Sequence, residues 1–384
     1  MCGIAGIVHL NGRPLDQHID RKILNDMASA MSHRGPDDES ISIWNNVGLA
    51  FRRLAINDLD GGTQPFETPD GRISVIANGE IYNHKNLRRD LEMRHTFKSK
   101  SDCEVLPYLY LDHGMDMFDS VNGMYAVALL DRQRQHLLLA RDRLGEKPLF
   151  YCILPESRSL VFASELKSLF SHPGVPRRFD WSTMLTRVQN VDMSLGERPS
   201  GFVDIERVPA GTILKVPLSD GNHTIHRYWK IPEQRSVDTS VTHEQCVLEY
   251  RSILEESVHM REEADVDCGL FLSGGIDSSA VVGMMARAGN RAVATASIGF
   301  TDSAFDESEY ARMAARHFHT DHREYVVTPN AVEVLQRLMW HFDEPFGDAS
   351  AIPTHYVSRL ARERVTVALS GDGGDENFAG YRRY

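Results

Sequence analysis

The residue with the clearest chemical potential is Cys2, which directly follows the initiator methionine. Removal of Met1 would leave Cys2 with a free α-amino group, whose ordinary pKa of about 7.7–8.0 gives a useful neutral fraction near neutral pH. Thiol and base would then belong to one residue, and no histidine partner would be needed. A lone cysteine is more often a small buried apolar residue, so Cys2 alone does not establish catalysis.

Three further segments carry groups that a glutamine substrate would need. The segment Arg52-Arg53-Leu54-Ala55-Ile56 offers a cation for the α-carboxylate, and Ser101-Asp102-Cys103-Glu104 offers an anion for the α-ammonium group. Asn78 and Gly79 offer donors for the oxyanion that forms at the carboxamide. Each segment also has a plain structural interpretation, because arginine can be a solvated edge residue, Ser-Asp a helix cap and Asn-Gly a hairpin turn.

Two loops in the second half of the chain suit a nucleotide. The run Ser273-Gly274-Gly275-Ile276-Asp277-Ser278-Ser279 follows an expected strand and opens an expected helix. Glycines let a backbone approach phosphate closely, the helix N-terminus adds N–H groups, and an aspartate could hold Mg²⁺ there. A second acidic loop, Ser370 to Glu376, follows another expected strand. Both loops therefore lie at carboxyl ends of parallel strands, where they could share Mg²⁺ on one ATP, although each could also be an ordinary turn.

The elements that must position these residues differ between the two halves. In the first half we expect strands at 74–77 and 124–130, turns at Asp60-Gly61-Gly62 and Asn78-Gly79, and helices at 21–31, 86–93 and 104–111. Residues 173–240 are expected to form the irregular tail of the first domain and the linker. In the second half we expect helices at 243–263, 279–288, 307–317 and 352–363, and strands at 267–272, 292–298, 323–327 and 365–369. This alternation predicts a parallel α/β sheet.

Length, charge and cysteine usage limit the class of protein. A chain of 384 residues predicts two domains, and the net charge of -12 argues against bulk nucleic-acid binding. There is neither a signal-peptide pattern nor a run of about 18 apolar residues, so no membrane association is expected. Five cysteines, an odd number without Cys-x-x-Cys spacing, favour a reduced, cytoplasmic compartment.

The N-terminal segments together resemble the class II glutamine amidotransferase domain. The resemblance rests on Met-Cys-Gly-Ile-Ala-Gly at the start, Ser32-His33-Arg34-Gly35-Pro36-Asp37, Arg53-Leu54, Asn78-Gly79-Glu80-Ile81-Tyr82-Asn83 and Ser101-Asp102-Cys103-Glu104. It implies an α+β N-terminal nucleophile fold, a four-layer αββα sandwich. By position it implies Cys2 as nucleophile, Asn78 and Gly79 as the oxyanion hole, and a glutamine pocket made by Arg53, Leu54, Ile56, Asn78, Gly79, Glu80 and Asp102.

The C-terminal loops resemble those of ATP pyrophosphatases, and the two domains in this order resemble the glutamine-hydrolysing asparagine synthetase family. Phe342-Asp343-Glu344-Pro345-Phe346, Ala349-Ser350-Ala351-Ile352-Pro353 and Ala368 to Glu376 extend that resemblance. It implies an α/β parallel-sheet domain that binds ATP through Leu272, Ser273, Gly274, Gly275, Asp277, Ser278, Ser279, Ile298, Ser370 and Gly371. It further implies Mg²⁺ at Asp277 and Asp375, and a role for Asp372 in forming an acyl-adenylate.

The resemblance implies a domain plan and a set of substrates. A glutaminase domain is expected at residues 2–215, a linker at 216–242 and the first part of an ATP-binding synthetase domain at 243–384. The substrates would be glutamine, ATP and aspartate or another carboxylic acid, and a homodimer is compatible with the family.

The chain departs from the family in two respects. Asn377-Phe378-Ala379-Gly380-Tyr381 replaces Leu-Phe-Gly-Gly-Tyr. The family also continues past Tyr384 with residues that include a lysine assisting adenylate formation, so a C-terminally truncated chain is expected.

Several alternatives stay open at this point. The acceptor could be a sugar acid or a peptide instead of aspartate. The chain could be a glutaminase whose synthetase half is inert, or a regulatory protein that only binds glutamine or nucleotide, although the intact set around Cys2 argues against the latter. A ring-forming synthetase fits less well, because such relatives usually lack the cysteine.

Other residues suggest ordinary structural roles. His317, His319 and His322 have irregular spacing and are interpreted as solvated side chains rather than metal ligands. Trp340 and its apolar neighbours are expected in the core. Buried positions are also expected for the remaining cysteines, which are Cys103, Cys152, Cys246 and Cys268.

Overall fold

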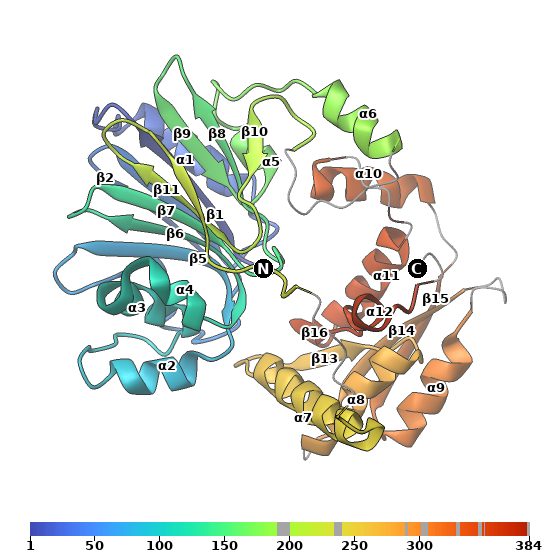
Figure 1. Ribbon diagram of the computed structural model, residues 1–384. Helices are drawn as coiled ribbons and strands as arrows, with labels where there is room; N and C mark the ends of the chain where they lie inside the picture. Colours follow the sequence, from blue (N-terminus) through green and yellow to red (C-terminus); the bar gives the residue numbers. More distant parts are fainter. Residues whose placement is uncertain are drawn as a thin grey trace. The chain divides into compact units, whose positions relative to one another are not determined.

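The computed structural model describes residues 1–189, 200–233, 240–288, 291–300, 306–327, 331–344, 348 and 350–381. Parts of the quoted motifs and of the predicted linker, namely Pro345, Phe346, Ala349 and residues 234–239, lie outside the described residues. The chain forms two compact units (Figure 1). The first comprises Met1–Pro232 with Asp343–Phe346, and the second comprises Glu233–Phe342 with Gly347–Tyr384.

The first unit is built on two antiparallel sheets of six strands each. One sheet has the order β10-β8-β9-β1-β3-β2, and the other has the order β12-β11-β7-β6-β5-β4. The strands of the first sheet are β1 Gly3–His9, β2 Asp38–Trp44, β3 Val47–Arg53, β8 Phe150–Leu154, β9 Ser159–Ala163 and β10 Ile205–Arg207. Those of the second are β4 Phe66–Glu67, β5 Ile73–Ile81, β6 Gly123–Asp131, β7 His136–Arg141, β11 Thr212–Pro217 and β12 Thr224–Arg227.

Helices cover the outer faces of these sheets (Figure 1). They are α1 Ile19–Ser29 and α5 Leu166–Leu169 on the first sheet, and α2 His84–Leu91, α3 Val105–His113 and α4 Met117–Ser120 on the second. Ile4, Phe51 and Leu139 are among the buried side chains between the two sheets. Apolar layers therefore lie between the sheets and under each helical cover, which confirms the predicted four-layer αββα fold.

The predicted turn at Asn78-Gly79 is wrong, because both residues lie within β5. Asn78 pairs with Ala126, and Gly79 pairs with Tyr125. A Cβ atom on Gly79 would lie 2.0 Å from the Met124 carbonyl oxygen, so the glycine permits a close approach of β5 and β6. Strand pairing with a distant segment has overridden the local turn preference.

Residues 173–240 are more regular than predicted. The described part of this stretch contains helix α6 Trp181–Gln189 as well as β10, β11 and β12. Strands β10 and β12 are edge strands of three and four residues, so their sequences lack the long apolar alternation that would mark them.

The second unit contains a four-stranded parallel sheet of order β15-β14-β13-β16, as the sequence predicts. Its strands are β13 Cys268–Phe271, β14 Ala294–Phe300, β15 Asp321–Val327 and β16 Val367–Leu369. Its helices are α7 His243–Glu262, α8 Ile276–Ala288, α9 Ser308–His317, α10 Ala331–Phe342, α11 Ala351–Arg362 and α12 Gly374–Phe378. A capping box at Thr242 and Gln245 begins α7.

Some local predictions for the second unit are wrong. Trp340 lies on α10 and is 52% exposed, because Val334 and Leu338 form the buried face of this helix instead. Cys246 is exposed on α7, and Cys268 is only partly buried. Within the described ranges, no helix is long and apolar enough to cross a membrane.

The family departure at Ala379 has a structural consequence. Ala379 ends α12 in the left-handed region with φ of 53°, where the family has glycine. A Cβ atom in this conformation costs roughly 1 kcal/mol relative to glycine.

Candidate active site

The first unit contains a small cavity of about 60 Å³ at the N-terminal end of β1. All of the predicted glutaminase residues line it, namely Cys2, Arg53, Leu54, Ile56, Asn78, Gly79, Glu80 and Asp102. They come from the residue before β1, from β3 and the loop after it, from β5, and from the short 3-10 helix at Asp102–Glu104. Segments of both facing sheets thus bring together residues that are up to 100 positions apart.

Cys2 owes its position to the register of β1. Gly3 pairs with Arg52 of β3, which places Cys2 beside the residues that follow that strand. The Leu54 N–H donates to Cys2 Sγ at 3.4 Å. Burial raises the pKa of the Cys2 thiol, while the bond from Leu54 acts in the opposite direction. Deprotonation therefore needs a nearby base, which the amine of an N-terminal cysteine would supply.

Asn78 is the most informative residue of the cavity. Its side chain is fully buried, yet Nδ2 and Oδ1 have no hydrogen-bond partner among the residues that the structure describes. Leaving a buried polar group unpaired costs about 1–3 kcal/mol, so such groups are usually satisfied. The Asn78 side chain therefore lines the cavity with both Nδ2 and Oδ1 unpaired, and both atoms are available to bind a polar group of a ligand.

Arg53 and Asp102 are held firmly before any substrate binds. The Arg53 guanidinium donates to the carbonyl oxygens of Asn57 and Leu59, each at 3.2 Å, and also to that of Asp58. Asp102 Oδ2 accepts the Ile81 N–H at 2.7 Å, which ties the carboxylate to the end of β5. Both charges are therefore oriented by backbone groups, as recognition of an amino acid's charged ends requires.

Sequence reasoning missed Lys147, which also lines this cavity. Its side chain is almost completely buried, and its amine lies 3.5 Å from Met1 Sδ. Burial lowers the pKa of this amine. Lys147 lies in a loop that no local motif marks as chemical, so only the folded arrangement reveals it.

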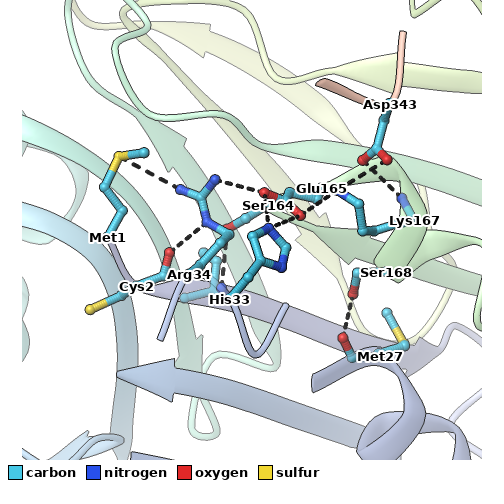
Figure 2. A network of polar contacts seen from close by, with 11 residues as sticks. Met1, Cys2, Met27, His33, Arg34, Ser164, Glu165, Lys167, Ser168 and Asp343 are labelled. Atoms are coloured by element: carbon cyan, nitrogen blue, oxygen red, sulfur yellow. Dashed lines mark hydrogen bonds and ion pairs between the residues drawn. The ribbon is translucent and has the colours of Figure 1, made fainter. Parts of the chain in front are cut away.

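Arg34 also contacts the backbone of Cys2 (Figure 2). Its Nε donates to the Cys2 carbonyl oxygen at 2.8 Å, and its Nη1 lies 2.9 Å from Glu165. Arg34 belongs to the motif Ser32–Asp37, for which the sequence implied no site residue, and its side chain supports the backbone of Cys2. Glu165 carries no recognisable motif and was not predicted.

The second unit contains a larger cavity of about 400 Å³ at the carboxyl ends of β13, β14 and β16. Most of the predicted ATP residues line it, namely Leu272, Ser273, Gly275, Asp277, Ser278, Ile298, Ser370, Gly371, Asp372 and Asp375. Gly274 and Ser279 do not line it. Gly274 adopts φ of +82° with its Cα against the α9 backbone, and the Ser279 N–H bonds to Gly275 within the first turn of α8.

The two predicted nucleotide loops touch each other. A Cβ atom on Gly371 would lie 2.7 Å from the Ser278 backbone nitrogen, and one on Gly374 would overlap the Asp277 carboxylate. Glycine at both positions therefore allows the two loops to approach each other as closely as a phosphate-binding site requires. Glu307 and Thr354 also line this cavity and were missed, because neither belongs to a loop with a recognisable motif.

The donor set fits a magnesium ion that is shared with phosphates. Asp277 and Asp375 place two carboxylates on the wall of one cavity. Over the part of the chain that is described, no group of three or more His, Cys, Asp or Glu side chains could hold a metal. Mg²⁺ in nucleotide sites commonly uses one or two carboxylates and completes its shell with phosphate oxygens and water, so two carboxylates suffice.

Of the three histidines near the end of α9, His317 and His319 are exposed, as predicted, whereas His322 is partly buried. His322 Nδ1 lies 2.9 Å from Thr295 Oγ1, and its Nε2 lies 3.2 Å from Ser297 Oγ. Its ring therefore joins β15 to β14 through hydroxyl groups.

Comparison with known proteins identifies the family. The glutamine amidotransferase domain model matches residues 1–229, and the asparagine synthase model matches residues 249–384. Putative asparagine synthetase (glutamine-hydrolyzing) 2 of Methanocaldococcus jannaschii is 33% identical over 405 residues, covering 99% of this chain and 76% of that protein. This chain belongs to the glutamine-hydrolysing asparagine synthetase family.

Two further members of this family come from Bacillus subtilis. Asparagine synthetase (glutamine-hydrolyzing) 2 is 38% identical over 397 residues, covering 99% of this chain and 52% of that protein. Asparagine synthetase (glutamine-hydrolyzing) 1 is 34% identical over 391 residues, covering 100% of this chain and 59% of that protein. The chain thus spans little more than half the length of these two relatives.

Proposed function

We propose that this chain hydrolyses glutamine at Cys2 and uses the ammonia to amidate a carboxylic acid that ATP has activated. Aspartate is the proposed acceptor, and asparagine, glutamate, AMP and pyrophosphate are the products. The observation that carries the first half is the unpaired amide of Asn78 in the cavity of Cys2. The second half is supported by the contact between two nucleotide loops around one cavity.

Glutamine hydrolysis would proceed through a thioester. With Met1 removed, the Cys2 amine accepts the thiol proton while the sulfur attacks the carboxamide carbon. The Asn78 amide and the Gly79 N–H stabilise the oxyanion. The amine then returns the proton to the leaving nitrogen, which departs as ammonia. Water hydrolyses the thioester to release glutamate and regenerate the thiol.

Acceptor activation would take place in the second unit. An acceptor carboxylate oxygen attacks the α-phosphorus of ATP, pyrophosphate leaves, and ammonia then displaces AMP from the acyl carbon. Leu272 and Ile298 would flank the adenine, and Ser273, Gly275 and Ser278 would hold phosphate oxygens. Mg²⁺ held by Asp277 and Asp375 would neutralise phosphate charge. Asp372, whose carboxylate accepts the Ser370 hydroxyl at 2.8 Å, would assist adenylate formation.

Aspartate as acceptor is supported by the family, because no described side chain identifies the acid by itself. A sugar acid or a peptide carboxylate is the alternative acceptor within the same chemistry. Competition between these acids for ammonia transfer would distinguish them.

The decisive experiment separates the two half-reactions. The chain is incubated with glutamine, ATP, Mg²⁺ and aspartate, and glutamate, AMP and asparagine are followed separately beside a Cys2→Ala variant. Appearance of all three products, with loss of only the glutamine-driven reaction in Cys2→Ala, supports the proposal. Glutamate without AMP or asparagine would restrict the function to glutamine hydrolysis.

The remaining assignments are also proposals. We propose a glutaminase domain at residues 2–215, a linker at 216–242 and a synthetase domain from 243 onward. A cytoplasmic location is supported by five free cysteines and by the need for ATP. The homodimer would be tested by light scattering during size-exclusion chromatography.

A further inference from the structure

A network of charged side chains surrounds Glu165 in the first unit (Figure 2). Glu165 Oε1 lies 2.9 Å from Arg34 Nη1, and Oε2 lies 2.7 Å from Lys167 Nζ. His33 Nε2 is 3.1 Å from both carboxylate oxygens. Asp343 approaches Lys167 twice, at 3.1 Å from its amine and at 3.1 Å from its backbone nitrogen. All five side chains are at least three-quarters buried.

The network ends on the backbone of the nucleophile. Arg34 uses Nη1 for Glu165 and Nε for the Cys2 carbonyl oxygen, at 2.8 Å. The residue before Glu165 provides a second tie, because Ser164 exchanges hydrogen bonds with both the N–H and the carbonyl group of Ile4. The start of β1 is therefore held in two ways: by Glu165 through the guanidinium of Arg34, and by the adjoining Ser164 through its hydrogen bonds to Ile4.

The groups around Glu165 favour the ionised form of its carboxyl group. Burial alone would raise the pKa of this carboxyl group, but the His33 hydrogen bond and the charges of Arg34 and Lys167 lower it to about 2. Burial raises the pKa of Asp343, and the Lys167 charge opposes that rise. Two carboxylates thus face the basic side chains of Arg34 and Lys167, with His33 alongside. With a neutral side chain at position 165, the positive charges of Arg34 and Lys167 would be only partly compensated by neighbouring carboxylates.

We propose that Glu165 is a positioning residue for glutamine hydrolysis, which orients Cys2 through Arg34, and that Asp343 supports it by holding Lys167 on the second carboxylate oxygen. This inference rests on the proposed glutaminase function. Neither Glu165 nor Asp343 lines the cavity, so neither touches the substrate. Their effect passes through the Cys2 carbonyl, which fixes the direction from which the sulfur meets the carboxamide.

The role of Asp343 gives a distant part of the chain influence on the nucleophile. Asp343 directly follows α10 and belongs to the segment Asp343–Phe346 of the first unit, which is flanked in sequence on both sides by residues of the second unit. The adjoining Glu344 forms a buried ion pair with Arg207 and accepts the Gly201 N–H at 2.7 Å, which anchors this short segment to the first unit. Displacement of the segment would release Lys167 and weaken the hold on Glu165.

The test compares Glu165→Gln with the wild type in glutamine hydrolysis. The variant preserves side-chain shape and removes the charge, so kcat should fall by about ten- to a hundredfold. KM for glutamine should stay within about twofold, because Arg53 and Asp102 do not contact the network. Glu165→Asp, which restores the charge on a shorter side chain, and Asp343→Asn should each show a smaller fall in kcat.

A matched control is Asp131→Asn. Asp131 is a fully buried carboxylate of the same unit that accepts the N–H groups of Gln133 and Arg134 away from the cavity. Its loss should lower the melting temperature without changing kcat. An unchanged kcat in Glu165→Gln, or an equal loss in both variants, would overturn the positioning role.

A second readout keeps the inference separate from the proposed function. Alkylation of Cys2 by iodoacetamide, followed by mass spectrometry of the N-terminal peptide, does not require turnover. If the wild type releases no glutamate, the proposed function fails. The positioning of Cys2 by Glu165 is then judged by alkylation alone. It is supported if Glu165→Gln, and not Asp131→Asn, changes the alkylation rate at equal folded fraction, and it is refuted if the two rates agree.

Discussion

Replacement of Asn78 by alanine should have opposite effects on activity and stability. Asn78 Nδ2 and Oδ1 are buried and lack partners in the described structure, so the folded protein carries their desolvation cost. That cost is about 1–3 kcal/mol for an unpaired group. Alanine removes both atoms and leaves space that merges with the existing cavity of about 60 Å³. We expect a net gain of about 1 kcal/mol, or a rise in melting temperature of about 2–4 °C for a unit of this size.

The same change should severely impair glutamine hydrolysis. If the Asn78 amide donates to the oxyanion, its loss removes an interaction that forms only in the transition state. Loss of one such donor lowers kcat by about 10²–10³, which corresponds to about 2.7–4 kcal/mol. KM for glutamine should change little, because binding depends on the charged ends of the substrate.

The assay pairs steady-state glutamate release with thermal unfolding followed by circular dichroism. Asn46→Ala is the matched control, because Asn46 is equally buried but donates to the carbonyl oxygens of His9 at 2.8 Å and Leu218 at 3.4 Å. It should lose about 1–2 kcal/mol of stability and retain its kcat. If Asn78→Ala is destabilised as much as Asn46→Ala, or if it retains wild-type kcat, the oxyanion argument is wrong.

Three shorter predictions concern other parts of the chain. Burial lowers the pKa of the Met1 amine to about 5, and the charges of Arg34 and Lys147 act in the same direction. If removal of Met1 leaves the Cys2 amine beside the same cations, Lys147→Met should raise the pKa of that amine and move the acidic limb of the kcat/KM profile for glutamine upward, whereas Lys147→Arg should leave it in place. Gly371→Ala would bring a methyl group within 2.7 Å of the Ser278 nitrogen and should raise KM for ATP at least about tenfold in an AMP-release assay, with glutamate release unchanged. Glu344→Gln breaks a buried ion pair and should destabilise the first unit by about 3–5 kcal/mol in thermal unfolding; a loss below about 1 kcal/mol would contradict this.

The sequence was sufficient to propose Cys2 and the loop from Ser273 to Ser279 as site residues. Each candidate is marked by consecutive residues, so no folded context is needed to recognise the motif. The parallel sheet of the second unit was equally accessible, because buried strands and helices alternate there with clear turn residues.

The tertiary structure decided the features that depend on distant partners. The sequence suggests a turn at Asn78-Gly79, but pairing with β6 makes these residues part of a strand and leaves the Asn78 amide unpaired in the cavity. Lys147 and Glu165 have no motif, and they acquire their roles only through contacts with Met1 and Arg34. Sequence patterns report the preferences of neighbouring residues, whereas burial and charge pairing arise between residues that only the fold brings together.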